Sequence, residues 1–139
     1  MSTEESVTIV RRLIEEGFSR GDLDVCDALV AADGVEHQRG LAAGPAGTKE
    51  AIATLHRWFD DFRLEVEDVI AEGDRVWVRS TASGTNTGSV LGRPPTGRTF
   101  RITVFDAVRV VDGRIAEHWG VPDQLGLLVQ LGIFAPGAS

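Results

Sequence analysis

The chain has 139 residues, of which 42% are hydrophobic and 25% are charged, and its mean hydropathy is −0.02. This composition is typical of a single globular domain over residues 1–139, and it excludes disordered, collagen-like and disulfide-scaffold chains. The formal net charge of −7 opposes the basic surface that nucleic acids and anionic membranes attract. We therefore expect no nucleic-acid partner and no membrane partner.

The titratable side chains limit the possible chemistry further. The single cysteine, Cys26, cannot form an internal disulfide, which predicts a reducing, cytoplasmic location. The acidic N-terminus does not resemble a secretion signal. The three histidines lie far apart, and no ligand pair has the spacing of H-E-x-x-H, so we expect no metal site and no cofactor.

Helical patterns dominate the first part of the chain. Apolar residues recur at helical spacing over residues 4–19, and Asp22 is placed to cap a short second helix that buries Cys26. The Gly-rich residues 33–47 predict a short extended piece, residues 35–38, and then an ordered loop. A third helix is expected to begin at Gly47 or Thr48.

The later part of the chain alternates between apolar and polar residues, which predicts antiparallel strands joined by turns. The predicted strands cover residues 64–70, 75–84, 100–111 and 114–121, with turns at 73–74, 91–98 and 112–113 and a Leu-rich helical tail at 123–134. Three helices followed by such strands indicate an α+β fold, in which the helices cover one face of a curved sheet and leave a pocket beneath it.

Two positions in the strands are candidates for the pocket. Asp106 interrupts an otherwise apolar strand face, so it either lies desolvated in the pocket or pairs with Arg79 or Arg109. His118 and Trp119 alternate, so only one of them should face inward, and strict alternation from Ile115 favours Trp119.

Four features of the chain stand out together: RSTASGTNTG at 79–88, GRPPTGR at 92–98, Asp106 with Arg109, and DGRIAEHWGVPDQLGLLVQL at 112–131. In combination they resemble the SnoaL-like polyketide cyclases of the nuclear-transport-factor-2-like superfamily. The resemblance implies a conical α+β barrel, in which a strongly curved antiparallel sheet wraps around the N-terminal helices, and a homodimer. It also implies a cofactor-free aldol ring closure with an aspartate as general acid and base.

The resemblance assigns the acid–base role to Asp123, four residues after Trp119, although some relatives carry an acid where this chain has Gly120. Asp123 could equally be the N-cap of the helical tail. His37 matches a pocket-entrance histidine of the family, with a histidine bonded to loop backbone as the alternative, and Asn86 stands where a histidine is usual.

We expect Asp123, His37 and Asp106 to be catalytic. Aromatic side chains suit a planar polycyclic substrate but are equally common in cores. The expected substrate-binding residues are Trp119, Asn86, Arg79, Trp58, Phe59, Trp77 and His118.

The leading functional hypothesis is a cofactor-independent cyclase that closes a ring in a hydrophobic, carbonyl-bearing natural-product intermediate, as in antibiotic biosynthesis. One alternative is ring closure by oxygen attack, as in pyran formation, with Asp106 and Asp123 acting as a pair. Another is a non-catalytic domain that binds a small molecule or dimerises. The absence of a carboxylate from residues 75–84 argues against an epoxide hydrolase of the same superfamily.

Overall fold

The computed structural model describes residues 2–135. The first helix starts after Ser2, whose side chain accepts a hydrogen bond from the backbone N–H of Glu5 at 3.1 Å. A π-helical segment, η1, continues this helix, so the helix predicted over residues 4–19 is confirmed. The helical segments are α1 (Thr3–Arg12), η1 (Leu13–Ser19), α2 (Asp24–Leu29), α3 (Gly44–Trp58) and α4 (Gln124–Gln130).

Helix α3 begins at Gly44, earlier than the predicted start at Gly47 or Thr48. Pro45 occupies its first turn, where the missing N–H of proline leaves no hydrogen bond unmade. The proline therefore belongs to the helix and not to the loop before it.

The strands form one sheet in the order β1-β5-β4-β3-β2. Strands β2 to β5 pair antiparallel, whereas β1 runs parallel to β5 at one edge. The strands are β1 (Val30–Glu36), β2 (Arg63–Glu72), β3 (Arg75–Thr85), β4 (Thr99–Val111) and β5 (Arg114–Pro122).

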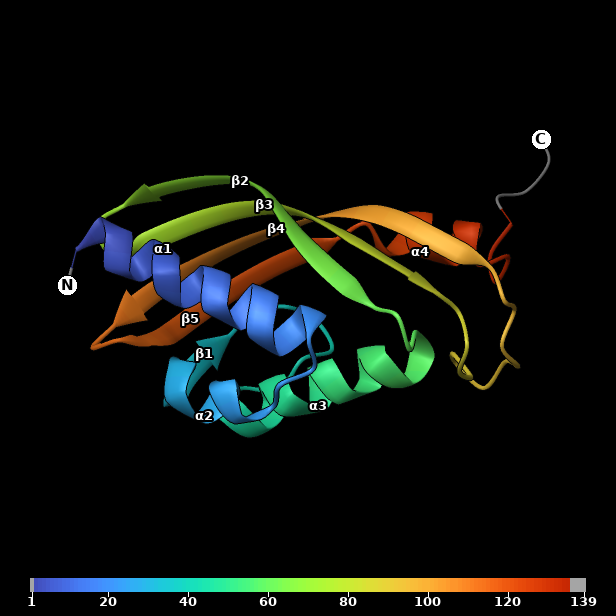
Figure 1. The fold of residues 1–139 in the computed structure, drawn as a ribbon, viewed down its shortest axis with the longest axis horizontal. Helices are drawn as coiled ribbons and strands as arrows, with labels where there is room; N and C mark the ends of the chain where they lie inside the picture. The colour runs from blue at the N-terminus through green and yellow to red at the C-terminus, as the bar shows by residue number, and fades with distance from the viewer. Residues whose placement is uncertain (1, 136–139) are drawn as a thin grey trace.

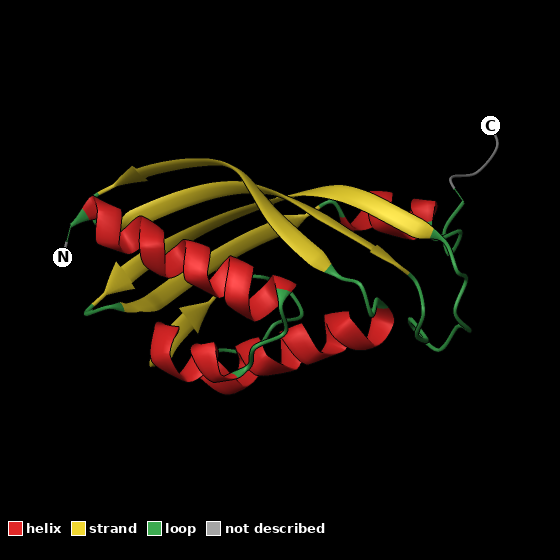
Figure 2. Cartoon of the chain, viewed as in Figure 1, coloured by secondary structure: helices red, strands yellow, loops and turns green. Residues whose placement is uncertain are grey.

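The predicted α+β class and the cover of N-terminal helices are confirmed, and the sheet arches over α1, α2 and α3 (Figure 1; Figure 2). The prediction of a wholly antiparallel barrel is wrong, because the sheet is mixed and open. In the part of the chain described, β1 and β2 form its two edges and do not pair with each other. Alternate residues of the inner face, such as Val76, Val78 and Val108, build the core against the helices.

The outer face of the sheet carries exposed large apolar side chains beside charged ones. Ile70, Trp77, Ala107 and Trp119 pair in one row across β2, β3, β4 and β5. Phe105 and Val121 pair in the neighbouring row. We call the exposed large residues of these rows the outer patch: Ile70, Trp77, Phe105, Trp119 and Val121, which are 71%, 64%, 55%, 37% and 70% exposed.

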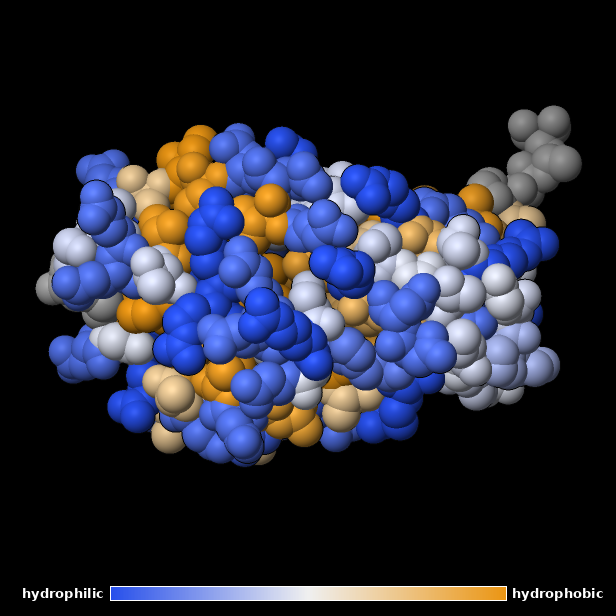
Figure 3. All heavy atoms as spheres, in the orientation of Figure 1, coloured by the Kyte–Doolittle hydropathy of each residue, from blue (hydrophilic) through white to orange (hydrophobic). Residues whose placement is uncertain are grey.

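The side of the molecule that carries α1 and α3 differs from the outer face of the sheet, because hydrophilic residues cover most of it (Figure 3). Within residues 2–135, no helix has the length and apolar character needed to cross a membrane.

Candidate active site

A cavity of about 470 Å³ lies between the inner face of the sheet and the helices. Its wall is mainly apolar and includes side chains from α1, η1, α3 and β4. Trp58 and Phe59, both expected to bind substrate, line this wall. The predicted pocket between helices and sheet is therefore present and suited to a hydrophobic ligand.

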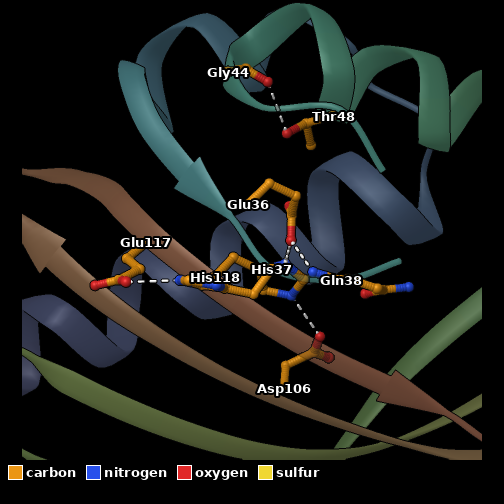
Figure 4. Close-up of polar contacts among 8 residues, drawn as sticks. All are labelled: Glu36, His37, Gln38, Gly44, Thr48, Asp106, Glu117 and His118. Atoms are coloured by element: carbon orange, nitrogen blue, oxygen red, sulfur yellow. Dashed lines mark hydrogen bonds and ion pairs between the residues drawn. The ribbon is translucent and has the colours of Figure 1, made fainter. Parts of the chain in front are cut away.

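Three charged side chains from three strands meet in the cavity. His118 of β5 lies between Asp106 of β4 and Glu36 of β1 (Figure 4). Its Nε2 is 2.7 Å from Asp106 Oδ1, and its Nδ1 is 2.6 Å from Glu36 Oε2. The side chains are only 21%, 16% and 13% exposed for His118, Asp106 and Glu36. Parallel pairing of β1 with β5 is what brings Glu36 to this place.

An irregularity in β5 decides which of its side chains enter the cavity. Val110 of β4 pairs with Ile115, but the preceding residue of β4, Arg109, pairs with Glu117. Ala116 is therefore an extra residue in β5, which is the geometry of a β-bulge. Beyond a bulge, the alternation of side chains is shifted by one residue.

The bulge turns His118 inward and Trp119 outward. His118 lines the cavity, whereas the Trp119 ring stacks on the His37 ring, with centroids 4.6 Å apart and an angle of 5° between the planes. The expectation that Trp119 faces the pocket is therefore wrong, since it assumed an unbroken alternation from Ile115.

The two carboxylates hold His118 in its charged form. Burial alone would lower the pKa of His118, but the hydrogen bonds and negative charges of Asp106 and Glu36 outweigh burial and raise the pKa to about 9. His118 is thus an imidazolium at neutral pH, and each of its N–H groups donates to one carboxylate.

His37 lies outside the cavity, contrary to the expectation that it would be catalytic. Its Nε2 is 2.7 Å from Glu117 Oε2, and Glu117 also accepts a hydrogen bond from Arg109 at 3.1 Å. The hydrogen bond to His37 and then that to Arg109 lower the pKa of Glu117. Residues alternate along this end of β1, so an inward Glu36 requires an outward His37.

Asp123 also lies outside the cavity. It is exposed and forms the N-cap of α4, where its Oδ1 accepts a hydrogen bond from the backbone N–H of Gly126 at 2.9 Å. The placement expected from the resemblance is therefore wrong, and the alternative reading of Asp123 as a helix cap is confirmed.

Asn86 is buried and bound to the protein itself. Its amide donates to the carbonyl oxygens of Trp58 and Gly88, and its Oδ1 accepts from the backbone N–H and the hydroxyl of Thr96. These bonds occupy the amide and fix the loop between β3 and β4. Asn86 therefore does not line the cavity, contrary to its expected place beside the substrate.

Trp77 and Arg79 were also expected to contact substrate, but both point away from the cavity. They are exposed residues of β3 on the outer face of the sheet, where they alternate with inward Val76 and Val78. Arg79 also forms no ion pair with Asp106, because the two side chains leave the sheet on opposite faces.

Two cavity residues, Glu36 and Gln38, were missed from the sequence. They flank His37, and both line the cavity. The signal for them was the alternation of residues 35–38: once His37 is assigned to the outer face, both of its neighbours must face inward.

The part of the chain that the structure describes contains no group of three His, Cys, Asp or Glu residues arranged to hold a metal ion. The cluster of His118 with two carboxylates is better described as an ion pair network, since both ring nitrogens carry protons.

Comparison with known proteins gives a consistent picture. The family model described as SnoaL-like polyketide cyclase matches residues 8–131. Aklanonic acid methyl ester cyclase DnrD of Streptomyces peucetius is 31% identical over 95% of this chain and 92% of its own length. Nogalonic acid methyl ester cyclase of Streptomyces nogalater is 29% identical over 83% of this chain and 89% of its own length.

Solved structures agree with these sequence matches. TsrD from Streptomyces laurentii superposes with a TM-score of 0.87 at 28% identity and covers 96% of this chain and 99% of its own. IdmH from Streptomyces antibioticus has a TM-score of 0.82 at 34% identity and covers 91% of this chain and 98% of its own. The comparisons support the cyclase hypothesis and offer nothing for the pyran-forming or accessory-domain alternatives.

Proposed function

This chain belongs to the SnoaL-like polyketide cyclase family, and from that premise we propose that it closes a ring in a hydrophobic polyketide ester with Asp106 as general base and general acid. The observation that carries the proposal is the Asp106 carboxylate in an apolar cavity, oriented by His118, which is in turn held by Glu36. Asp106 uses Oδ1 for His118, so its second oxygen is the one we assign to the substrate.

The reaction we assign is an intramolecular aldol closure. Asp106 accepts a proton from a carbon next to a carbonyl, and the enolate carbon attacks a second carbonyl carbon of the same molecule. The new alkoxide then receives the proton back from Asp106, so the atoms of substrate and product balance. The His118 imidazolium fixes the carboxylate in the geometry that proton transfer requires.

The substrate class follows from the relatives and from the cavity wall. Two relatives are named as cyclases of aklanonic acid and nogalonic acid methyl esters. For this chain we propose the methyl ester of a polycyclic polyketide acid, because the Trp58 side chain in the cavity wall can pack on fused rings.

The test compares Asp106→Asn with the wild type on these two methyl esters, with substrate and cyclised product separated by chromatography. We expect Asp106→Asn to lower kcat by about 10²- to 10⁴-fold, the usual contribution of a general acid–base group. Asp123→Asn is the matched control, since it replaces an aspartate outside the cavity and should keep wild-type turnover. Unchanged turnover by Asp106→Asn would remove Asp106 from the role, and failure of the wild type on both esters would contradict the substrate class.

We also propose that the protein is a homodimer joined through the outer patch. The support is that five large apolar side chains lie uncovered on one sheet face, which monomeric proteins seldom expose. A second copy offers the same apolar surface, as a two-fold interface requires. Sedimentation analysis should find twice the chain mass, and a monomer at high protein concentration would contradict the proposal.

A further inference from the structure

Proton abstraction beside a carbonyl leaves negative charge on the carbonyl oxygen, and that oxygen needs a hydrogen-bond donor. His118 would be the obvious donor in this cavity. Both of its N–H groups are already used, however, one for Asp106 at 2.7 Å and the other for Glu36 at 2.6 Å. The donor to the substrate must therefore be another group.

Gln38 lies at the same point of the cavity as the acid–base pair. Gly120, which pairs with Asp106 across β4 and β5, has no side chain, and the space above it is filled by its neighbours. A Cβ at Gly120 would overlap Gln38 Oε1, and it would lie 2.8 Å from Asp106 Oδ1 and 2.9 Å from His118 Cε1. The carboxamide oxygen of Gln38 thus converges with Asp106 and His118 on one small volume, and the NH2 donor is the other arm of the same planar group.

The carboxamide of Gln38 is available for a ligand. It makes no hydrogen bond with any residue from 2 to 135, although it lines the cavity. The threonine hydroxyls of the wall are already engaged: Thr48 donates to the Gly44 carbonyl at 3.2 Å, and Thr54 donates to Glu50 at 3.3 Å. Two other donors of the wall, Arg39 and Gln124, are exposed residues, whereas Gln38 is half-buried.

Glu36 holds Gln38 in this place. Its Oε2 accepts the backbone N–H of Gln38 at 2.9 Å and the Nδ1–H of His118 at 2.6 Å (Figure 4). One carboxylate oxygen therefore fixes both the backbone that carries the amide and the ring that orients Asp106. This shared anchor keeps the backbone of Gln38 beside the base, so the carboxamide can reach a substrate held at Asp106.

We propose that the Gln38 carboxamide donates a hydrogen bond to the substrate carbonyl whose neighbouring carbon gives its proton to Asp106, and so stabilises the enolate. The inference rests on the proposed function of Asp106. No bond to Gln38 is made or broken: the proton moves from carbon to Asp106, and the charge left on oxygen is met by the amide N–H. Gln38 is then a catalytic residue, and Glu36 a positioning residue.

The first experiment measures turnover of the methyl esters by Gln38→Met, which keeps the length of the side chain and removes the amide. We expect kcat to fall by about 10²-fold, as for loss of one donor to a developing oxyanion. Gln130→Met, the same change at an exposed glutamine outside the cavity, is the matched control and should keep wild-type kcat. Gln38→Leu provides a second apolar replacement should Gln38→Met not fold.

The second experiment does not depend on turnover. Asp106→Asn imitates the neutral, protonated state of Asp106, so in this background the cavity should bind 2-naphthol in its anionic form as an enolate mimic. Adding Gln38→Met should weaken this binding by about 10- to 100-fold, the range for a hydrogen bond to a charged group. Binding of naphthalene, which has no oxygen, should stay unchanged and would report any general damage to the cavity.

The two proposals can fail separately. One outcome overturns the role of Gln38 and leaves Asp106 in place. In that outcome Asp106→Asn loses turnover, whereas the Gln38 variants keep wild-type kcat and bind 2-naphthol as tightly as before. Full turnover in Asp106→Asn would instead overturn the function on which this inference rests. An equal loss of naphthalene and 2-naphthol binding would show that Gln38 shapes the cavity and donates nothing, which also overturns the inference.

Discussion

His118 connects the stability of the fold to pH, because both of its ring nitrogens are bonded to carboxylates. Its pKa in the folded protein is about 9, against 6.5 for an unperturbed histidine. The folded chain therefore holds a proton that the unfolded chain releases between these two values. The stability that comes from this proton is complete below pH 6.5 and is lost as the pH rises through about 9.

We predict that the free energy of unfolding of the wild type falls between pH 6.5 and pH 9 and that His118→Gln removes most of this decline. Glutamine keeps a polar group beside Asp106 and Glu36 but has no proton to lose in this range. Urea unfolding at several pH values measures the effect. Equal slopes of the unfolding free energy against pH in the wild type and in His118→Gln would contradict the prediction. The pKa of Cys26 is also raised, chiefly by burial, but Cys26 is present in both proteins and contributes equally to both slopes.

At the scale of single elements, α4 depends on its cap. Asp123 satisfies the backbone N–H of Gly126 in the first turn of a helix that places Leu127 in the cavity wall. We predict that Asp123→Ala lowers the free energy of unfolding by about 1 kcal/mol, the typical value for loss of an N-cap, while Asp123→Asn loses much less. Chemical denaturation of both variants measures this difference. A loss of turnover in Asp123→Asn with unchanged stability would return Asp123 to the catalytic role.

Some helices and strands could be predicted from the sequence, and others could not. Periodicity over residues 4–19 and alternation after residue 64 located the first helix and the antiparallel strands, because those patterns reflect local burial. The parallel pairing of β1 with β5 was not predictable, since residues 30–36 carry no alternating pattern and their partner lies some eighty positions away, as the Glu36 to His118 contact shows.

The candidate site was predicted only in part for a related reason. Asp106 stood out because a charged residue on an apolar strand face is costly without a partner. The partner of Asp106 is His118, which strict alternation assigns to the wrong face. The bulge at Ala116 depends on how β4 and β5 pair, so the sequence of β5 alone does not reveal it. A single extra residue in β5 thus turns His118 into the cavity and Trp119 out of it.

At the scale of the whole molecule, the proposed function divides catalysis and association between the two faces of the sheet. The inner face carries Asp106 and His118, and the outer face carries the outer patch, because neighbouring residues of one strand point to opposite faces. None of the outer-patch residues lines the cavity. Association and turnover should therefore be separable by substitution on the outer face.

Trp77 lies in the middle of the longest apolar row of the outer patch, between Ile70 and Ala107. We predict that Trp77→Arg weakens self-association by about 100-fold, as expected when a charged side chain replaces an aromatic anchor at the centre of an interface, and keeps kcat per chain. Sedimentation over a range of concentrations, combined with the ester assay, measures both quantities. Leu23→Arg is the matched control, because Leu23 is an exposed apolar residue beside α2, and it should change neither. Retention of the wild-type mass by Trp77→Arg would mean that copies of the chain meet elsewhere than on the sheet.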